Sequence, residues 1–199
     1  MSNTSARILL VSVFIARGTS FLFSKTLLQS LSPTSILAVR FLLAFLILAV
    51  IFHKKLLQCS KNSFRGGLIL GALYTLCMFF EMFGLRYVDT GVSSLVENMA
   101  IVMVPVFTAA LTRTLPEKRT MFCALIAVVG VGFLSLTQNS SGGSHAGMIL
   151  TVLAAVTYAI CIMATEKVSR DAEPVTIGII QLGTMGVLSL FAALITGDF

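Results

Sequence analysis

Charged residues and tryptophan are scarce in this sequence. Of its 199 residues, 11% are Asp, Glu, Lys or Arg and none is Trp, whereas 57% are hydrophobic and the mean hydropathy is +0.98. A soluble domain usually carries about 25% charged residues. The composition therefore excludes an ordinary soluble globular protein and indicates helices that are solvated by lipid.

Motifs for metal binding and hydrolysis are also missing from the sequence. Its four cysteines form no Cys-x-x-Cys pair, and its two histidines, His53 and His145, are expected near opposite faces of the membrane. This pattern fits neither a zinc site nor a disulfide framework. There is no Gly-x-Ser-x-Gly or His-Glu-x-x-His motif and no Asp within a hydrophobic run. We therefore expect no enzyme activity, no metal and no cofactor.

Seven hydrophobic runs are long enough to cross a bilayer, which takes about 20 apolar residues. Prolines, glycines or clustered charges separate them, as at Ser32-Pro33 and Pro116-Glu117. The alternating segments of a membrane β-barrel are absent from the sequence. We predict an all-α polytopic membrane protein. Its transmembrane helices are expected over residues 8–28, 34–53, 66–87, 91–112, 119–137, 147–167 and 175–196.

The basic residues predict the orientation of the chain. The loops 29–34, 88–90 and 138–146 hold no Lys or Arg. If the N-terminus is cytoplasmic, ten of the fourteen basic residues lie inside: Arg7, Lys54, Lys55, Lys61, Arg65, Arg113, Lys118, Arg119, Lys167 and Arg170. The positive-inside rule therefore predicts a cytoplasmic N-terminus in a plasma or inner membrane. The net charge of +6 follows from this topology and does not indicate a nucleic-acid partner.

A weak internal repeat is found when the chain is shifted by 141 residues. Pro33 then falls on Pro174, and Arg40 falls on Gln181. The turn before Pro33 is uncharged, whereas the turn before Pro174 carries basic and acidic residues. The two copies are therefore expected to point in opposite directions across the membrane. Inverted repeats are typical of transporters, which bind their substrate at mid-membrane between the halves.

Several short motifs resemble EamA-type members of the drug/metabolite transporter superfamily, in the family's order and spacing. They are Gly18-Thr19-Ser20-Phe21, Lys25, Leu31-Ser32-Pro33, Arg40-Phe41, Gly84-Leu85-Arg86-Tyr87, Pro105-Val106-Phe107 and Leu115-Pro116-Glu117-Lys118. The resemblance covers essentially the whole chain and departs at Arg17, where the family commonly has Trp. It implies ten helices in two inverted repeats of five, which export amino acids, metabolites or drugs by alternating access.

Under this resemblance, residues 1–138 form the first repeat and residues 146–199 form part of the second. The chain is then truncated after the seventh of ten expected helices. Two functions stay open: a transporter of small molecules, or a non-transporting membrane protein that is a truncated remnant or an assembly partner. Small residues such as Gly67-x-x-x-Gly71 leave open a homodimer within the lipid bilayer.

Four charged residues fall inside the predicted helices: Arg17, Arg40, Glu81 and Glu97. A charge there costs about 2.5–3.5 kcal/mol unless it faces the bundle or water. The last three are expected at similar depth, so we predict that Arg40 pairs with Glu81 or Glu97. Such a pair could lock the helices together, or a glutamate could serve as a substrate or proton site.

Polar residues also recur at helical spacing, on one face of the helix 91–112 and one face of the helix 8–28. Pro105 removes a backbone hydrogen bond from the former helix and is expected to bend it. These polar faces could line a cavity or serve close helix packing. The candidate substrate-binding residues are Glu97, Ser94, Asn98, Arg17, Ser20, Ser24, Tyr74, Glu81 and Tyr158.

Overall fold

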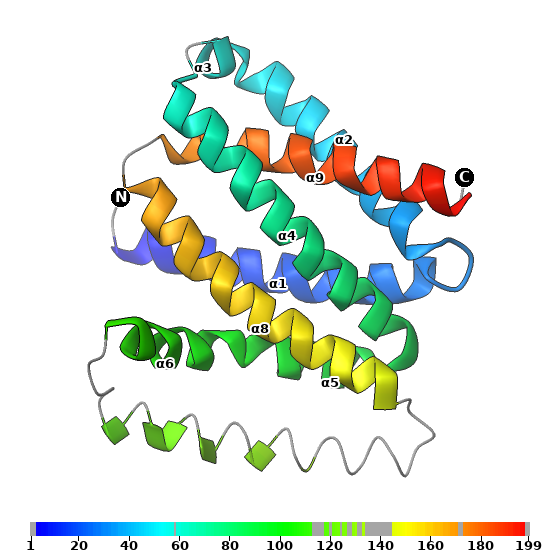
Figure 1. Ribbon diagram of the computed structural model, residues 1–199, viewed down its shortest axis with the longest axis vertical. Coiled ribbons are helices and arrows are strands. Elements are labelled where there is room, and N and C mark those ends of the chain that lie inside the picture. Colours follow the sequence, from blue (N-terminus) through cyan, green and yellow to red (C-terminus); the bar gives the residue numbers. More distant parts are fainter. Residues whose placement is uncertain are drawn as a thin grey trace.

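The computed structural model describes residues 3–57, 59–112, 118–119, 121–123, 125–126, 129–130, 133, 145–170 and 173–197. Over these residues the protein is a set of packed α-helices without a strand (Figure 1). The helices are α1 (Asn3–Leu27), α2 (Pro33–Ile51), α3 (His53–Leu57), α4 (Lys61–Tyr87), α5 (Thr90–Asn98), α6 (Ala100–Thr112), α8 (His145–Ser169) and α9 (Pro174–Thr196).

The described residues contain five segments that are long and apolar enough to cross a membrane. They are Pro33–Ile51, Lys61–Tyr87, Thr90–Leu111, His145–Ser169 and Pro174–Thr196. Each matches a predicted span, and α1 is a helix of 25 residues over the first one. The span predicted over 119–137 lies mostly outside the described residues. The helical membrane architecture is therefore confirmed, whereas the count of seven helices stays a prediction.

Capping residues determine where several helices begin. Ser32 Oγ accepts a hydrogen bond from the N–H of Ser35 at 3.3 Å, and Pro33 occupies the first turn of α2. Ser60 caps α4 in the same way, and Glu173 is the N-cap residue of α9. N-cap oxygens satisfy donors that the first turn leaves open, and proline has no donor to satisfy there. The loop signals in the sequence therefore mark real helix starts.

Helix α4 packs along α8, crosses α9 and lies between them in the bundle (Figure 1). Its glycines allow this. A Cβ on Gly71 would lie 2.4 Å from Cβ of Thr184 in α9, and one on Gly84 would lie 2.7 Å from Oγ1 of Thr151 in α8. Helices in lipid associate through close van der Waals packing, which small residues permit. The glycines of α4 thus allow α8 and α9 to pack closely against it.

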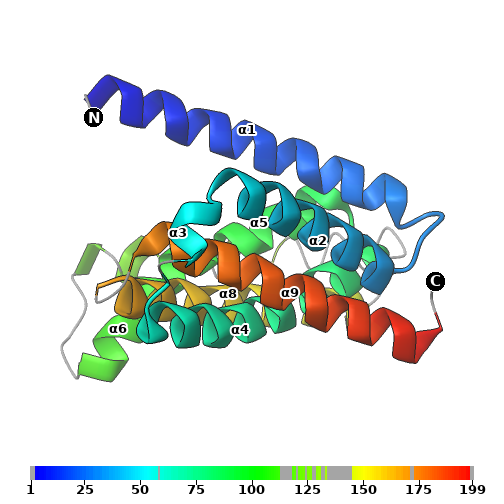
Figure 2. The same cartoon turned by 90° about the horizontal axis from the view of Figure 1, so that it is seen from above.

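Helix α1 is set apart from the rest of the bundle (Figure 2). Near its C-terminal end, the Lys25 ammonium group donates hydrogen bonds to the carbonyl oxygens of Leu85 at 2.5 Å and Val88 at 2.8 Å. Carbonyls at a helix C-terminus lack partners within the helix, and a cation there also interacts favourably with the helix dipole. Lys25 therefore tethers α1 to the C-terminal end of α4.

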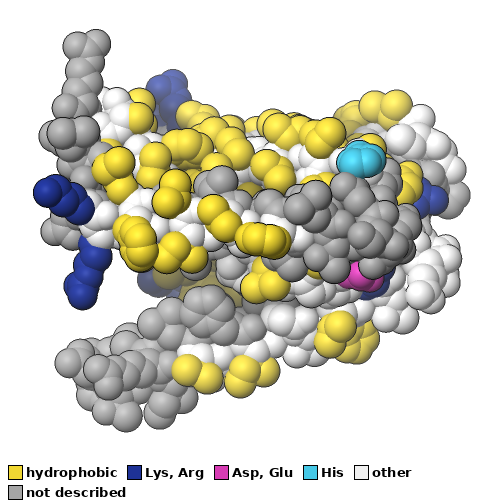
Figure 3. All heavy atoms as spheres, turned by 90° about the horizontal axis from the view of Figure 1, so that it is seen from below, with side chains coloured by type: hydrophobic (Ala, Val, Ile, Leu, Met, Phe, Trp, Pro, Cys, Tyr) yellow, Lys and Arg dark blue, Asp and Glu magenta, His cyan; other side chains and the backbone are white. Residues whose placement is uncertain are grey.

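Most of the basic side chains in view lie toward one end of the bundle, and hydrophobic side chains cover its middle (Figure 3). The salt bridge from Lys55 to Glu173 joins α3 to the start of α9, and the contact of Gly66 with Val168 joins the start of α4 to the end of α8. This end, called the basic end below, therefore carries Lys54, Lys55, Lys61, Arg65, Lys167 and Arg170. The apolar middle is the surface that a bilayer would cover.

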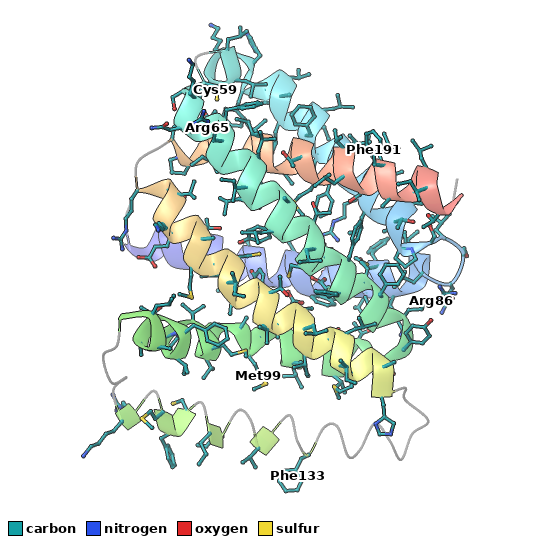
Figure 4. The ribbon with its side chains drawn as sticks, viewed as in Figure 1. Cys59, Arg65, Arg86, Met99, Phe133 and Phe191 are labelled. Atoms are coloured by element: carbon teal, nitrogen blue, oxygen red, sulfur yellow. The ribbon has the colours of Figure 1, made fainter. Side chains whose placement is uncertain are left out.

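The span Thr90–Leu111 is broken into two helices. Helix α5 ends at Asn98, α6 begins at Ala100, and Met99 lies between them (Figure 4). The Asn98 side chain donates a hydrogen bond to the carbonyl oxygen of Ser94 at 2.8 Å. Side chains that bond to the backbone of their own helix compete with its hydrogen-bond ladder. The sequence predicts a bend at Pro105, but the break comes earlier in the chain, at Met99, and Pro105 lies inside α6.

Candidate substrate cavity

A cavity of about 440 Å³ lies among five helices that are distant in sequence. Its size falls within the range of about 300–1,000 Å³ that is usual for small-molecule sites. The lining residues are Ala16, Ser20, Phe21 and Ser24 of α1, Arg40 and Phe41 of α2, Tyr74, Met78 and Glu81 of α4, Tyr158 of α8, and Gln181, Leu182 and Met185 of α9.

The cavity brings together residues that the 141-residue shift relates. Arg40 of α2 and Gln181 of α9 are equivalent under this shift, and both line the cavity. The Arg40 guanidinium lies 5.7 Å from the centre of the Phe41 ring, close enough for a cation–π interaction. The two equivalent positions therefore offer one cation and one neutral amide to the same space.

Two tyrosines form an aromatic wall of the cavity. The rings of Tyr74 and Tyr158 meet edge to face, with centroids 6.2 Å apart and an interplanar angle of 83°. The Tyr74 hydroxyl lies 3.4 Å from Oγ1 of Thr165, so its polar end has a hydrogen-bond partner on α8. Paired aromatic rings, one of them anchored by its hydroxyl, give a surface against which an apolar part of a ligand can pack.

The two predicted glutamates lie in one region, although only one of them lines the cavity. Glu81 is a buried residue of the cavity wall, and Glu97 is 2% exposed at the end of α5. The Cys77 thiol of α4 lies within electrostatic range of both carboxylates. The Arg40 side chain is exposed and lies over the Phe41 ring. A structural ion pair of Arg40 with Glu81 or Glu97 stays a prediction.

The other predicted site residues divide into two groups. Ser20 and Ser24 of α1 line the cavity. Ser94 and Asn98 do not, because each side chain donates to a carbonyl of its own helix: Ser94 to Gly91 at 2.9 Å and Asn98 to Ser94 at 2.8 Å. Arg17 lies in the helical backbone of α1, and its side chain is outside the described part of the structure.

Several lining residues were not predicted from the sequence. Phe41, Met78 and Met185 are apolar, and an apolar side chain in a membrane helix faces lipid as readily as it faces a cavity. Gln181 could have been found, because the 141-residue shift places it on Arg40. No group of three or more His, Cys, Asp or Glu residues in the described part of the chain could hold a metal ion.

A helical bundle that encloses a cavity with polar and charged walls within an apolar belt defines a polytopic membrane protein with an internal binding site. The chain belongs to the EamA-like transporter family, whose sequence pattern matches residues 4–136. This membership confirms the resemblance found in the sequence motifs. It places the chain in a family of membrane transporters.

Two curated relatives are similar to the chain over much of its length. An uncharacterized transporter, YcxC, of Bacillus subtilis (strain 168) is 28% identical over 158 residues, which cover 77% of this chain and 51% of that protein. An uncharacterized transporter of Archaeoglobus fulgidus is 27% identical over 192 residues, which cover 96% of this chain and 58% of that protein. The chain therefore spans little more than half the length of these relatives. No solved structure matches it.

Proposed function

We propose that the chain forms part of a transporter that exports small metabolites, amino acids or drugs by alternating access. The observation that carries the proposal is the cavity shared by α1, α2, α4, α8 and α9, which has both charged and aromatic walls. In this proposal residues 1–138 are the first repeat and residues 146–199 belong to the second. The basic end faces the cytoplasm, as the positive-inside rule favours.

The contacts between α2 and α9 support an inverted repeat. Phe45 of α2 packs against Gly183 of α9, and Leu42 packs against Gly186. Under the 141-residue shift, Leu42 is equivalent to Gly183 and Phe45 to Gly186. Replacing each residue of the first contact by the residue that the shift relates to it therefore gives the second contact. A two-fold axis imposes this relation on an interface between two equivalent units. Repeats related in this way can rock against each other about a central site.

The broken span supports the same proposal. Transporters place discontinuous helices at mid-membrane, where irregular backbone is tolerated because it faces protein or a cavity. Glu97 lies buried at the end of α5, next to the break at Met99. We propose that Glu97, with Ser94, Asn98 and Arg17, contributes to the site in other conformations of the transport cycle.

The chemistry of the cavity indicates the kind of molecule that it accepts. Arg40 supplies a positive charge, Glu81 a carboxyl group, and Tyr74 and Tyr158 an apolar surface with hydroxyl groups. Ser20 and Ser24 add hydroxyl groups from α1. A small molecule that combines polar groups with an aliphatic or aromatic part would use all of these walls.

Transport by cells that produce the protein tests this proposal. Efflux of a panel of toxic amino acid analogues and drugs would be compared between the unmodified chain, Glu81→Gln and Glu166→Gln. Glu166 is the control because it is an exposed carboxylate on α8 outside the cavity. We expect Glu81→Gln to lower efflux at least tenfold at an unchanged membrane level, and Glu166→Gln to leave it unchanged.

Two results would contradict the proposal. If no compound of the panel is exported by the unmodified chain, the protein does not transport these classes. If Glu81→Gln is lost from the membrane while the control is retained, the carboxylate serves the fold rather than the substrate.

A further inference from the structure

A groove separate from the substrate cavity runs between α2, α4 and α9. Its volume is about 580 Å³, and no residue lines both spaces. Leu42 and Phe45 of α2, Phe64 and Leu68 of α4, and Gly183 and Val187 of α9 form its walls. Phe64 is 51% exposed and Leu68 is 41% exposed, so the groove is open at the surface that the bilayer would cover.

The inside of the groove offers a ligand no open hydrogen-bonding group. Its polar side chains are Thr184 and Cys59. Thr184 Oγ1 donates to the carbonyl oxygen of Ile180 at 2.9 Å, and Cys59 Sγ donates to that of Ser60 at 3.3 Å. A polar ligand group buried here would lose its hydration without compensation. The groove is therefore suited to a hydrocarbon chain.

Two cations lie at the basic end of this groove. Lys61 precedes Phe64 by three residues and Leu68 by seven, so all three lie on one face of α4. Arg65 adjoins Phe64 in the first turns of α4, close to Cys59 (Figure 4). In the described part of the chain, Lys55 and Arg170 pair with carboxylates, whereas Lys61 and Arg65 form no ion pair. They are available to an anion from outside the protein.

We propose that this groove binds an acyl chain of an anionic phospholipid whose phosphate group lies on Lys61 and Arg65. Lipid tails are as apolar as leucine, so the chain gains little by leaving the bilayer for the groove. Preference for this lipid must therefore come from its headgroup. A basic residue near an anionic headgroup favours binding about fivefold, which corresponds to about 1 kcal/mol.

Because the sequence has no tryptophan, a single introduced tryptophan can report on lipid binding by its fluorescence. Leu68→Trp places the single tryptophan of the chain in the groove wall. Leu43→Trp is the matched control, because Leu43 is a leucine of α2 that is 54% exposed and does not line the groove. Each variant of the full chain would be placed in phosphatidylcholine vesicles containing brominated phosphatidylglycerol or brominated phosphatidylcholine, whose bromine atoms quench nearby tryptophan.

We expect brominated phosphatidylglycerol to quench Leu68→Trp at a mole fraction about 25-fold lower than brominated phosphatidylcholine, about fivefold for each of the two cations. The two lipids should quench Leu43→Trp equally. Adding Lys61→Gln or Arg65→Gln to Leu68→Trp should weaken the preference about fivefold each. Lys167→Gln, at the same end but outside the groove, should leave it unchanged.

Three results would overturn the proposal. Equal quenching of Leu68→Trp by both lipids would show that the groove has no headgroup preference. A preference that survives the loss of both cations would place the phosphate elsewhere. Quenching by neither lipid would show that protein, such as a second copy of the chain, covers the groove. If a tryptophan variant does not fold, native mass spectrometry of the unmodified chain provides a second test. The chain should then be found bound to phosphatidylglycerol in preference to phosphatidylcholine.

Discussion

Helices α1 and α8 are equivalent under the 141-residue shift, yet their surroundings differ. Helix α8 packs along α4 with a buried face of small side chains: Gly147, Thr151, Ala154, Ala155, Ala159 and Cys161. Helix α1 stands apart (Figure 2), and among its side chains that the structure describes, Phe21 and Ser24 are buried. Positions that the shift relates therefore do not guarantee equivalent packing.

The size of the side chains along α8 accounts for its close packing on α4. Gly84 of α4 leaves no room for a Cβ beside Thr151, and a Cβ on Gly147 would lie 2.6 Å from Cβ of Tyr87. Small residues allow close backbone approach between helices in lipid. Small residues at the contact thus let α8 join α4 closely.

The largest effect is expected from enlarging a small residue of α8. Ala159 is fully buried, so Ala159→Leu should lower the free energy of unfolding by about 3 kcal/mol through overpacking. Its equivalent in α1 is Gly18, beside which an added Cβ meets no atom within 4 Å. Gly18→Leu should be neutral or stabilise by up to about 1 kcal/mol through helix propensity. Unfolding of both variants in the same detergent checks this, and equal losses would contradict it.

A smaller effect is expected from releasing α1 from α4. Lys25→Met removes two hydrogen bonds from an ammonium group to main-chain carbonyls. The expected cost is about 1.5 kcal/mol, the lower end of the range for charged hydrogen bonds, because Lys25 is half-exposed. The backbone amides of α1 should then exchange hydrogen about tenfold faster.

The control for this variant is Glu166, the equivalent residue of α8. Glu166 pairs with exposed Arg170 within its own helix, which contributes about 0.3–0.5 kcal/mol. Glu166→Gln should leave hydrogen exchange in α8 nearly unchanged. Unchanged exchange in α1 of Lys25→Met would show that other contacts hold this helix.

The smallest effect concerns the residues that begin α2 and α9. Ser32 and Glu173 are the equivalent N-cap residues. Hydrogen bonds from Lys55 and Thr176 lower the pKa of Glu173 below its ordinary value of about 4.3. The ionised carboxylate therefore stabilises the folded state, and this contribution is lost as the pH falls through the lowered pKa.

Melting temperatures measured at several pH values test this prediction. Glu173→Gln should melt slightly lower than the unmodified chain at neutral pH, and the difference should vanish in acid. Ser32→Ala should instead lower the melting temperature equally at every pH, since a hydroxyl cap does not titrate in this range. A difference for Glu173→Gln that persists in acid would assign its effect to packing.

Much of the fold could be predicted from the sequence because lipid imposes simple requirements on it. Five spans follow from hydropathy, and the starts of α2 and α9 follow from Pro33 and Pro174. The break at Met99 was not predicted. It falls within a continuous apolar run, and hydropathy does not register where such a run changes from one helix to the next.

The candidate site was predicted in part, for a related reason. Ser20, Ser24, Tyr74, Glu81 and Tyr158 stand out as polar residues in apolar helices, and all of them line the cavity. The polar face of α5 also predicts cavity residues, but the side chains of Ser94 and Asn98 donate hydrogen bonds to carbonyls of their own helix. The apolar walls could not be predicted, because in a membrane helix hydrophobicity does not distinguish the inside from the outside.

The paired contacts of α2 with α9 have a consequence for how closely these two helices can approach. In both contacts α2 supplies a bulky side chain, Leu42 or Phe45, and α9 supplies glycine, Gly186 or Gly183. Two identical hairpins joined in this way would press a leucine against a phenylalanine twice and could not come as close. The spacing seen here therefore requires that positions related by the shift carry side chains of different size, bulky in α2 and absent in the glycines of α9.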